Sequence, residues 1–344
     1  MKLAISLGYS GAQMDLPIKK VLQAEELGYD SVWTAEAYGS DAVTPLAFLA
    51  AHTKKIKLAT GIMQLAARTP ASASRVAMHI AALAGGDRVI AGLGVSGPQI
   101  VEGWYGQPWG KPYWRIRDYV TIMKKIFKRQ GPVLHEGKEI SLPYNGPGAM
   151  GIGKPLQSIL HPNPNIPIWL GTSTETNIRL TAEIADGWLA MRFVPRMMPY
   201  FRPILEEGFK RAGNGKSLRN FDIHSGVSVK ITDDVKSEIQ KSKAHVALYV
   251  GGMGHRDVNF HHDAMARRGF QKEADRIQEL FLSGYRDEAV LAVPDEYVEE
   301  EALMGSPERI KEGWKAWRDC GVTSLSIGTD QDEALELMAN LARE

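Results

Sequence analysis

Segments typical of buried β-strands alternate with segments typical of α-helices along this 344-residue chain. The strand-like runs are short and apolar, as parallel strands covered on both faces are. Several helix-like runs begin with a capping residue and a proline, at Thr44-Pro45, Thr69-Pro70 and Ser306-Pro307. The strands expected are Leu3–Leu7, Ser31–Thr34, Ile56–Ile62, Arg88–Val95, Ile166–Leu170, Gly187–Met191, Phe221–Ile231 and Val322–Ile327.

Eight strand–helix units favour a closed (β/α)8 barrel, although a doubly wound open sheet would also fit the alternation. The hydrophobic fraction of 44% is enough for one large core. The alternation breaks at residues 131–165, which are rich in Gly and Pro and predict a loop or short hairpin. It breaks again at residues 251–293, where partly helical structure is expected. We therefore predict one (β/α)8 barrel domain over residues 1–344 with two insertions.

Composition excludes several classes of partner. The net charge is +1 with acids and bases interspersed, so no basic stripe indicates nucleic acid or an anionic membrane. No apolar run is long enough to span a bilayer, and the strand-like start predicts no signal peptide. The single cysteine, Cys320, allows no internal disulfide, which fits a reducing compartment. We expect a cytoplasmic protein that acts on a small molecule.

In a (β/α)8 barrel the active site lies at the carboxyl ends of the strands. Small residues predominate at the positions expected there, which suits a large planar ligand better than a metal cage. No metal is expected: His255, His261 and His262 lack a cysteine partner and are interpreted as residues of a solvated loop. The positions at the strand ends are Gly8, Glu36, Gly61, Ile62, Ser96, Gly97, Gly171 to Thr174, Met191 and Arg192.

Two glycine-containing stretches mark where a ligand would approach the backbone. Lys57–Gln64 is a buried strand that runs into Gly61, where a flat ring could lie against a residue without Cβ. Gly92–Gly97 is not a GxGxxG motif after a first strand, so a Rossmann interpretation is weak. Glycines inside a strand, such as Gly94, instead indicate close approach by a ligand or by another backbone segment.

Three other features each leave two interpretations open. The hydroxyl-rich loop Gly171–Asn177 enters a helix, and it either binds a phosphate or is an ordinary N-cap. Glu36 either pairs with an amide-like edge of a cofactor or acts as an acid or base, or it forms a salt bridge with a barrel arginine. A group of aromatic residues forms a pocket wall or a dimer interface: Trp104, Tyr105, Trp109, Tyr113 and Trp114.

Five motifs, in order along the chain, resemble the bacterial luciferase-like superfamily and specifically its deazaflavin-dependent oxidoreductase branch. The resemblance covers essentially the whole chain. The motifs are Glu26–Glu36 (ELGYDSVWTAE), Ala59–Ile62 (ATGI), Ala67–Pro70 (ARTP), Gly92–Gln99 (GLGVSGPQ) and Ala182–Trp188 (AEIADGW).

The resemblance implies a (β/α)8 barrel, usually a homodimer, with coenzyme F420 (8-hydroxy-5-deazaflavin) over the strand ends. It implies a cis peptide bond at Gly61–Ile62 against the central ring, and a phosphate held by the loop Gly171–Asn177. It places Glu36 near the polar edge of the ring, as a catalytic residue that would orient or protonate there. The implied cofactor-binding residues are Glu36, Thr60, Gly61, Ile62, Gly94, Val95, Ser96, Gly171, Thr172, Ser173, Thr174 and Asn177.

Two departures from the family pattern narrow the expected activity. Sugar-phosphate dehydrogenases of this family carry a histidine after the acid on the second strand, where this chain has Ala37. They also carry a glutamate on the fourth-strand loop, where this chain has Gly97 and Pro98. The pattern is closer to methylenetetrahydromethanopterin reductase-like members. We expect hydride transfer between C5 of the deazaflavin and an organic substrate, the alternatives being an FMN-dependent monooxygenase and a cofactor-binding protein without turnover.

Overall fold

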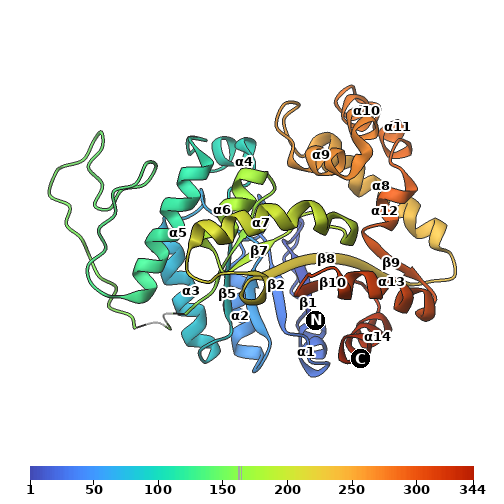
Figure 1. Ribbon diagram of the computed structural model, residues 1–344, viewed down its shortest axis with the longest axis horizontal. Helices are drawn as coiled ribbons and strands as arrows, with labels where there is room; N and C mark the ends of the chain where they lie inside the picture. Colours follow the sequence, from blue (N-terminus) through green and yellow to red (C-terminus); the bar gives the residue numbers. More distant parts are fainter. Residues whose placement is uncertain (162, 164) are drawn as a thin grey trace. The chain divides into compact units, whose positions relative to one another are not determined.

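The structure is a computed structural model that describes residues 1–161, 163 and 165–344. Strands and helices alternate along most of these residues (Figure 1). The strands are β1 (Lys2–Gly8), β2 (Ser31–Thr34), β3 (Lys57–Thr60), β4 (Met63–Gln64), β5 (Val89–Gly94), β6 (Ile168–Gly171), β7 (Gly187–Leu189), β8 (Asp222–Ile231), β9 (Ala302–Gly305) and β10 (Ser324–Gly328).

The helices carry the connections between these strands. They are α1 (Ile18–Glu26), α2 (Thr44–His52), α3 (Pro70–Ala84), α4 (Pro98–Gly103), α5 (Pro112–Lys128), α6 (Glu175–Ile184), α7 (Met198–Ala212), α8 (Val235–Gly252), α9 (Phe260–Met265), α10 (Gln271–Leu282), α11 (Arg286–Leu291), α12 (Asp295–Glu299), α13 (Pro307–Asp319) and α14 (Asp332–Arg343). No described helix is both long enough and apolar enough to cross a membrane.

The order of strand pairing identifies the fold. Eight strands follow the order β10-β1-β2-β3-β5-β6-β7-β8, and β10 also pairs with β8, so the pairing closes on itself. Neighbours such as β1 and β10, β2 and β3, and β5 and β6 are parallel. The fold is therefore a (β/α)8 barrel, and this prediction is confirmed. Two strands lie outside the ring: β4 pairs with β5, and β9 pairs with β8.

The chain divides into two compact units, which we describe separately. Unit 1 comprises residues 1–5, 190–203 and 223–344, and unit 2 comprises residues 6–189 and 204–222. The expectation of a single domain over the whole chain stays a prediction.

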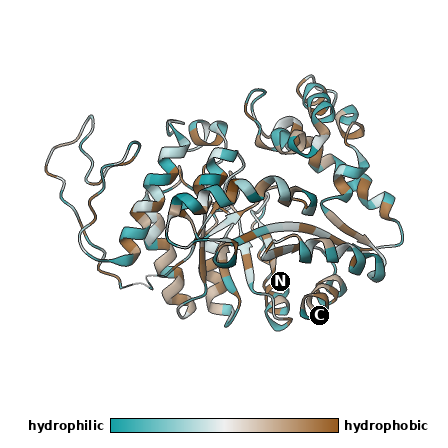
Figure 2. Cartoon of the chain, viewed as in Figure 1, coloured by the Kyte–Doolittle hydropathy of each residue, from teal (hydrophilic) through white to brown (hydrophobic). Residues whose placement is uncertain are grey.

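The core of unit 2 is built from strands that are apolar on both faces. All six residues of β5 are buried, and so are all four residues of β2. The rings of Trp33 on β2 and Trp169 on β6 pack with their centroids 5.2 Å apart. Figure 2 shows the hydrophobic colouring concentrated along strands and on single faces of helices. This distribution is what parallel strands covered by amphipathic helices require.

The insertion predicted at residues 251–293 is helical and belongs to unit 1. Helices α8 to α12 share a hydrophobic cluster that includes Val246, Ile277 and Tyr297. A π-helical segment, Ala266–Phe270, joins α9 to α10, and Gly269 in it has a φ of 96°. An L-residue resists that backbone conformation, so glycine permits the kink between the two helices.

The insertion predicted at residues 131–165 is a loop that leaves α5 as a long excursion, drawn in green in Figure 1. Residues 162 and 164 of this segment lie outside the described residues. The buried carboxylate of Asp118 on α5 holds its base: it accepts the backbone N–H groups of Glu139 and Ile140 at 2.8 and 3.0 Å. The other carboxylate oxygen of Asp118 lies 3.1 Å from His135 Nε2.

The helix caps agree with prediction in part. Thr69 caps α3 and Ser306 caps α13 through their side chains, as predicted. Thr44 does not cap α2: the Asp41 carboxylate accepts the N–H groups of residues 43 and 44, so the helix begins at Thr44 itself. Helix α8 is capped by Asp234, whose side chain accepts the Ser237 N–H, and Gln331 occupies the N-cap position of α14.

Lys216 provides a pH-dependent test of packing in unit 2. Its ammonium donates to the Ala185 carbonyl, and burial lowers the pKa of Lys216 to about 8, against the opposing charge of Asp186. Between pH 8 and 10.5 the unfolded chain therefore binds more protons at Lys216 than the folded chain does, and stability rises with pH.

We expect Lys216→Met to lack this rise. Across that pH window the free energy of unfolding of the wild type should therefore increase by about 1–2 kcal/mol relative to that of the variant, after allowance for solvent screening. Urea unfolding of both proteins at a series of pH values measures the gain. Lys210→Met, on the exposed face of α7, is the matched control and should keep the wild-type slope. If the free energies of unfolding of the wild type and Lys216→Met differ by the same amount at every pH, the pKa of Lys216 is not lowered in the folded protein.

Candidate functional site

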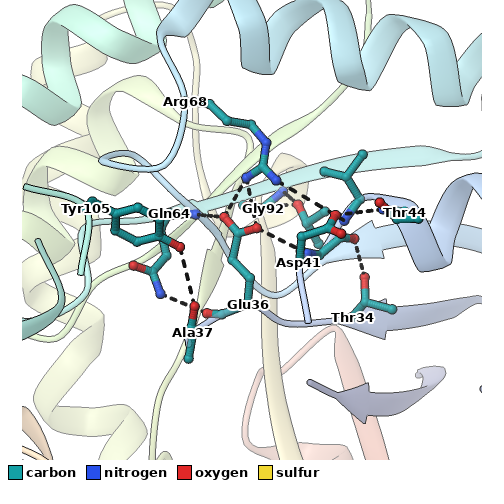
Figure 3. A network of polar contacts seen from close by, with 12 residues as sticks. Thr34, Glu36, Ala37, Asp41, Thr44, Gln64, Arg68, Gly92 and Tyr105 are labelled. Carbon is teal, nitrogen blue, oxygen red and sulfur yellow. Dashed lines mark hydrogen bonds and ion pairs between the residues drawn. The ribbon is translucent and has the colours of Figure 1, made fainter. Parts of the chain in front are cut away.

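Glu36 follows the carboxyl end of β2 and forms the centre of a buried polar network (Figure 3). Its side chain is 2% exposed. Its two oxygens accept hydrogen bonds from the backbone N–H of Ala42 at 3.1 Å, the backbone N–H of Gln64 at 2.7 Å, and Nη1 of Arg68 at 2.6 and 2.8 Å. The carboxylate thus joins the end of β2 to β4 and to the segments that precede α2 and α3.

Arg68 extends this network to Asp41. One Arg68 nitrogen lies 3.8 Å from Asp41 Oδ1, and the same carboxylate holds the start of α2. Burial by itself would raise the pKa of Asp41, but hydrogen bonds from Thr44 and Val43 and the charge of Arg68 outweigh it and lower that pKa. Burial also disfavours the charged form of Arg68, and contact with Glu36 more than compensates, so the pKa of Arg68 is raised.

Of the two roles considered for Glu36, the structure shows the salt bridge with a barrel arginine. A carboxylate that already accepts four close hydrogen bonds has little remaining capacity to bind a ligand directly. We therefore assign Glu36 to positioning the strand ends. The acid–base role and the contact with the polar edge of a cofactor both stay predictions.

The Gly61–Ile62 peptide bond is cis, as the resemblance implies. The Ile62 side chain lies against backbone that carries no side chain: a Cβ at Gly94 would come within 3.1 Å of Ile62 Cδ1, and a Cβ at Gly171 within 3.1 Å of Ile62 Cγ2. Gly94 also pairs with Gly171 across the sheet. The absence of a Cβ at Gly94 and Gly171 thus makes room for the half-buried Ile62 side chain, and the backbone of Gly61 beside it is exposed. We call Gly61, Ile62, Gly94 and Gly171 the glycine ledge.

Gln64 escaped the sequence analysis, and Tyr105 was predicted only as a member of the aromatic group. Gln64 is 2% exposed, and its Nε2 donates to the Glu36 carbonyl at 2.9 Å. Its Oε1 is buried without a hydrogen-bond partner among the described residues. The Tyr105 hydroxyl makes a long 3.4 Å contact with the Ala37 carbonyl. Burial, followed by the charge of Glu36, raises the pKa of Tyr105. In Figure 3 the Tyr105 hydroxyl and the Gln64 amide lie on the same side of Glu36.

Of the other residues predicted on or just after β3 and β5, one is used in hydrogen bonds between the strands and two are partly open to solvent. The Thr60 side chain is committed to β5: its hydroxyl donates to the Gly92 carbonyl at 2.8 Å and accepts from the Gly92 N–H at 2.9 Å. Val95 and Ser96 are half-buried directly after β5. Ser96 has a φ of 62°, which is uncommon for a residue other than glycine and recurs at functional sites.

The loop from Gly171 to Asn177 contains an N-cap. Thr174 caps α6, and its side chain accepts the Asn177 N–H at 3.4 Å. Thr172 points inward: its hydroxyl pairs with the Thr181 hydroxyl at 2.8 Å, and its carbonyl accepts from Trp188 Nε1 at 2.9 Å. Ser173 and the first backbone N–H groups of α6 remain the groups of this loop that a phosphate could reach.

The predicted aromatic group does not form one wall. Trp104 is 61% exposed and follows α4, close in sequence to Tyr105 beside the ledge. Tyr113 and Trp114 pack edge to face on α5, and the Lys138 ammonium lies 3.7 Å from the Trp114 ring centroid. Within the described ranges, no group of three or more His, Cys, Asp or Glu side chains has a geometry suited to a metal ion.

Comparison with known proteins places this barrel in a family. The family model for luciferase-like monooxygenases matches residues 14–324. A Mycobacterium tuberculosis protein, provisionally named a coenzyme F420-dependent oxidoreductase, is 42% identical over 343 residues, covering 99% of each chain. The chain belongs to the luciferase-like monooxygenase family.

Two solved structures share the fold. The F420-dependent tetrahydromethanopterin reductase of Methanopyrus kandleri superposes with a TM-score of 0.78 at 24% identity, covering 98% of this chain and 97% of that one. An FMN complex of a type II Baeyer-Villiger monooxygenase from a Pseudomonas putida plasmid superposes with a TM-score of 0.66 at 19% identity, covering 98% and 96%. At these identities the likeness concerns the fold.

Proposed function

We propose that this protein is an F420-dependent oxidoreductase that transfers a hydride between C5 of the deazaflavin and an organic substrate. Family membership supports an oxidoreductase, and the mycobacterial relative at 42% identity supports F420 as the cofactor. The observation that carries the assignment to a site is the glycine ledge with the unpaired Gln64 Oε1 beside it. The exposed backbone of Gly61 and the half-buried Ile62 side chain offer a place for a flat ring, and a buried acceptor needs a donor.

The residues of unit 2 fit such a ring. Its lactam edge carries an N–H group, which matches the unpaired oxygen of Gln64. Its face would lie on Ile62, and its phosphate would lie at Ser173 and the N-terminus of α6, where backbone N–H groups and the helix dipole favour an anion. The Glu36–Arg68 pair would act indirectly by holding β2 and β4 in register beneath the ring.

When bound, the deazaflavin supplies the carbon that gives or takes the hydride. The contribution of the protein is to position the reactants and to exclude water, since bringing reacting atoms within ~3–3.5 Å supplies much of the rate. The Tyr105 hydroxyl makes only a long 3.4 Å contact with the Ala37 carbonyl, and we propose that it orients the substrate.

Replacement of Gln64 tests the site. Gln64→Leu is expected to weaken deazaflavin binding about 10-fold, because the ring loses a hydrogen bond worth about 1–1.5 kcal/mol. Titration of the apo-protein, followed by quenching of its tryptophan fluorescence, measures the affinity. Gln99→Leu, on the exposed face of α4, should bind like the wild type. Equal affinities for all three proteins would remove Gln64 from the site.

FMN is the second candidate cofactor, because an FMN-binding enzyme shares the fold and both rings carry a lactam edge. Oxygen consumption with reduced flavin would support an FMN-dependent monooxygenase. Oxidation of reduced deazaflavin by an added substrate, without oxygen uptake, would support the proposed oxidoreductase. Tight deazaflavin binding without hydride transfer to any screened substrate would favour the third interpretation, a binding protein without turnover.

We also propose a cytoplasmic homodimer. The resemblance to the luciferase-like superfamily and the exposed Trp104, Phe48 and Leu83 support the dimer. Light scattering on the purified protein would test the oligomeric state.

A further inference from the structure

Unit 1 contains a second group of ionisable side chains, separate from the glycine ledge. Arg192 lies three residues after the end of β7 and has a φ of 54°, a conformation uncommon for a non-glycine residue. Its side chain is 16% exposed, and Nη1 donates to Glu301 Oε2 at 2.7 Å. A guanidinium has five N–H donors, so this bond leaves most of its hydrogen-bonding capacity unused.

Aromatic rings surround this guanidinium. Arg192 Cζ lies 5.7 Å from the centroid of the Tyr249 ring. The Tyr249 ring contacts His245, one turn earlier on α8, at 4.4 Å, and His261 on α9 edge to face at 4.7 Å. His245 is exposed while its ring packs on the half-buried Tyr249 ring, so this surface is open to a ligand on one side. We call Arg192, His245, Tyr249 and His261 the arginine–aromatic cluster.

A single positive charge remains after the neighbouring ion pairs are counted. Arg268, with 1% of its side chain exposed, pairs with both Glu300, at 2.7 Å, and Glu301. Arg196 also pairs with Glu300, at 2.5 Å. Three guanidiniums, those of Arg192, Arg196 and Arg268, thus share two carboxylates. This group of side chains therefore carries one excess positive charge, which a ligand with a single negative charge would neutralise.

The two imidazoles of the cluster are neutral at neutral pH. Burial, followed by the charges of Arg192 and His245, lowers the pKa of His261 to about 3. Burial and the charge of Arg192 also lower the pKa of His245, against the opposing charge of Glu301. His261 Nδ1 is buried and has no partner among the described residues. A buried polar atom without a partner is destabilising, so a ligand that supplies the missing hydrogen bond is favoured there.

We propose that the arginine–aromatic cluster is a binding site for the carboxylate of a planar, monoanionic organic acid. The guanidinium fork matches the two oxygens of a carboxylate, and the rings of Tyr249 and His245 offer faces on which a flat molecule stacks. The neutral imidazoles offer further hydrogen bonds. As a statement about the substrate of the oxidoreductase, this inference rests on the proposed function.

A nuclear magnetic resonance titration of the histidine side chains in the apo-protein tests the site, with benzoate as the probe and benzamide as its uncharged analogue. Benzoate is expected to bind saturably and to raise the pKa of both His245 and His261, because its charge offsets that of Arg192. Benzamide should bind at least about tenfold more weakly, since one lost charged hydrogen bond has that effect. Inorganic phosphate should compete weakly.

Three variants separate binding from folding. Arg192→Met is expected to weaken benzoate binding about tenfold or more, and His245→Ala, on an exposed position, about threefold. His255→Ala, an exposed histidine outside the cluster, should bind benzoate like the wild type. If Arg192→Met fails to fold, His245→Ala still decides the question.

Absence of a benzoate-dependent shift at His245 and His261, equal binding of benzamide, or stronger binding of phosphate would each overturn the proposal. Deazaflavin affinity is measured separately on the same preparation. Deazaflavin binding without benzoate binding would reject this site alone, whereas benzoate binding without deazaflavin binding would reject the proposed function and keep the carboxylate site.

Discussion

Gly92→Ala is expected to prevent the barrel from folding or to leave it severely destabilised. A Cβ at position 92 would lie 1.8 Å from the Thr60 carbonyl oxygen and 3.2 Å from the Leu189 side chain. The nearer atom is backbone of β3, held by the two hydrogen bonds between Thr60 and Gly92, so neither strand yields without breaking the sheet. Overpacking a core costs about 1–3 kcal/mol when flexible side chains adjust, and a rigid backbone raises the cost further.

Expression in soluble form and the urea midpoint measure this effect. Gly97→Ala is the matched control, because a Cβ there would meet nothing within 4 Å and its φ is not in the left-handed region. It should unfold at the wild-type midpoint. A soluble Gly92→Ala protein with an unchanged midpoint would mean that β3 and β5 are not packed as described.

Arg68→Met has the second large expected effect. It leaves the Glu36 carboxylate, with 2% of its side chain exposed, buried without its counter-charge. Removal of one partner from a buried ion pair costs about 3–5 kcal/mol, much of it the desolvation of the charge left behind. Urea unfolding measures the loss. Because the pair positions the strand ends beneath the glycine ledge, deazaflavin affinity should fall in the same variant.

The double variant Arg68→Met/Glu36→Gln separates the buried charge from lost packing. The double variant should be more stable than Arg68→Met alone, because it no longer buries a carboxylate without a counter-charge. Arg211→Met is the surface control: its pair with Glu207 is nearly half-exposed on both sides, and its loss should cost less than about 0.5 kcal/mol. A loss for Arg68→Met as small as that of Arg211→Met would show that the network in Figure 3 does not stabilise the fold.

The barrel could be predicted from the sequence because each strand carries its own local signal. A run such as Val89–Gly94 is apolar throughout, and buried parallel strands require that composition. Strand β9, only four residues between α12 and α13, has too little pattern to be predicted. The N-cap at Thr44 was predicted wrongly because Asp41, three residues earlier, captures the backbone N–H groups first.

The sequence predicted which glycines lie at the candidate site. It did not predict which polar side chains contact one another there. Gly61, Gly94 and Gly171 are recognisable as strand-end positions. The partner of Glu36 is not, because Arg68 lies 32 residues away, and only the fold brings the two together. Gln64 gives no sequence signal either, since its significance is one amide oxygen that has no hydrogen-bond partner in the described part of the structure. The arginine–aromatic cluster likewise joins Arg192 to rings on α8 and α9 that lie more than 50 residues further along the sequence.

The most direct test of the central claim is an equilibrium titration of the purified apo-protein with deazaflavin and, separately, with FMN, followed by quenching of tryptophan fluorescence. The account predicts saturable, micromolar binding of deazaflavin, weak binding of FMN, and a loss of deazaflavin affinity in Gln64→Leu. Preferential binding of FMN, or no binding of deazaflavin, would contradict it.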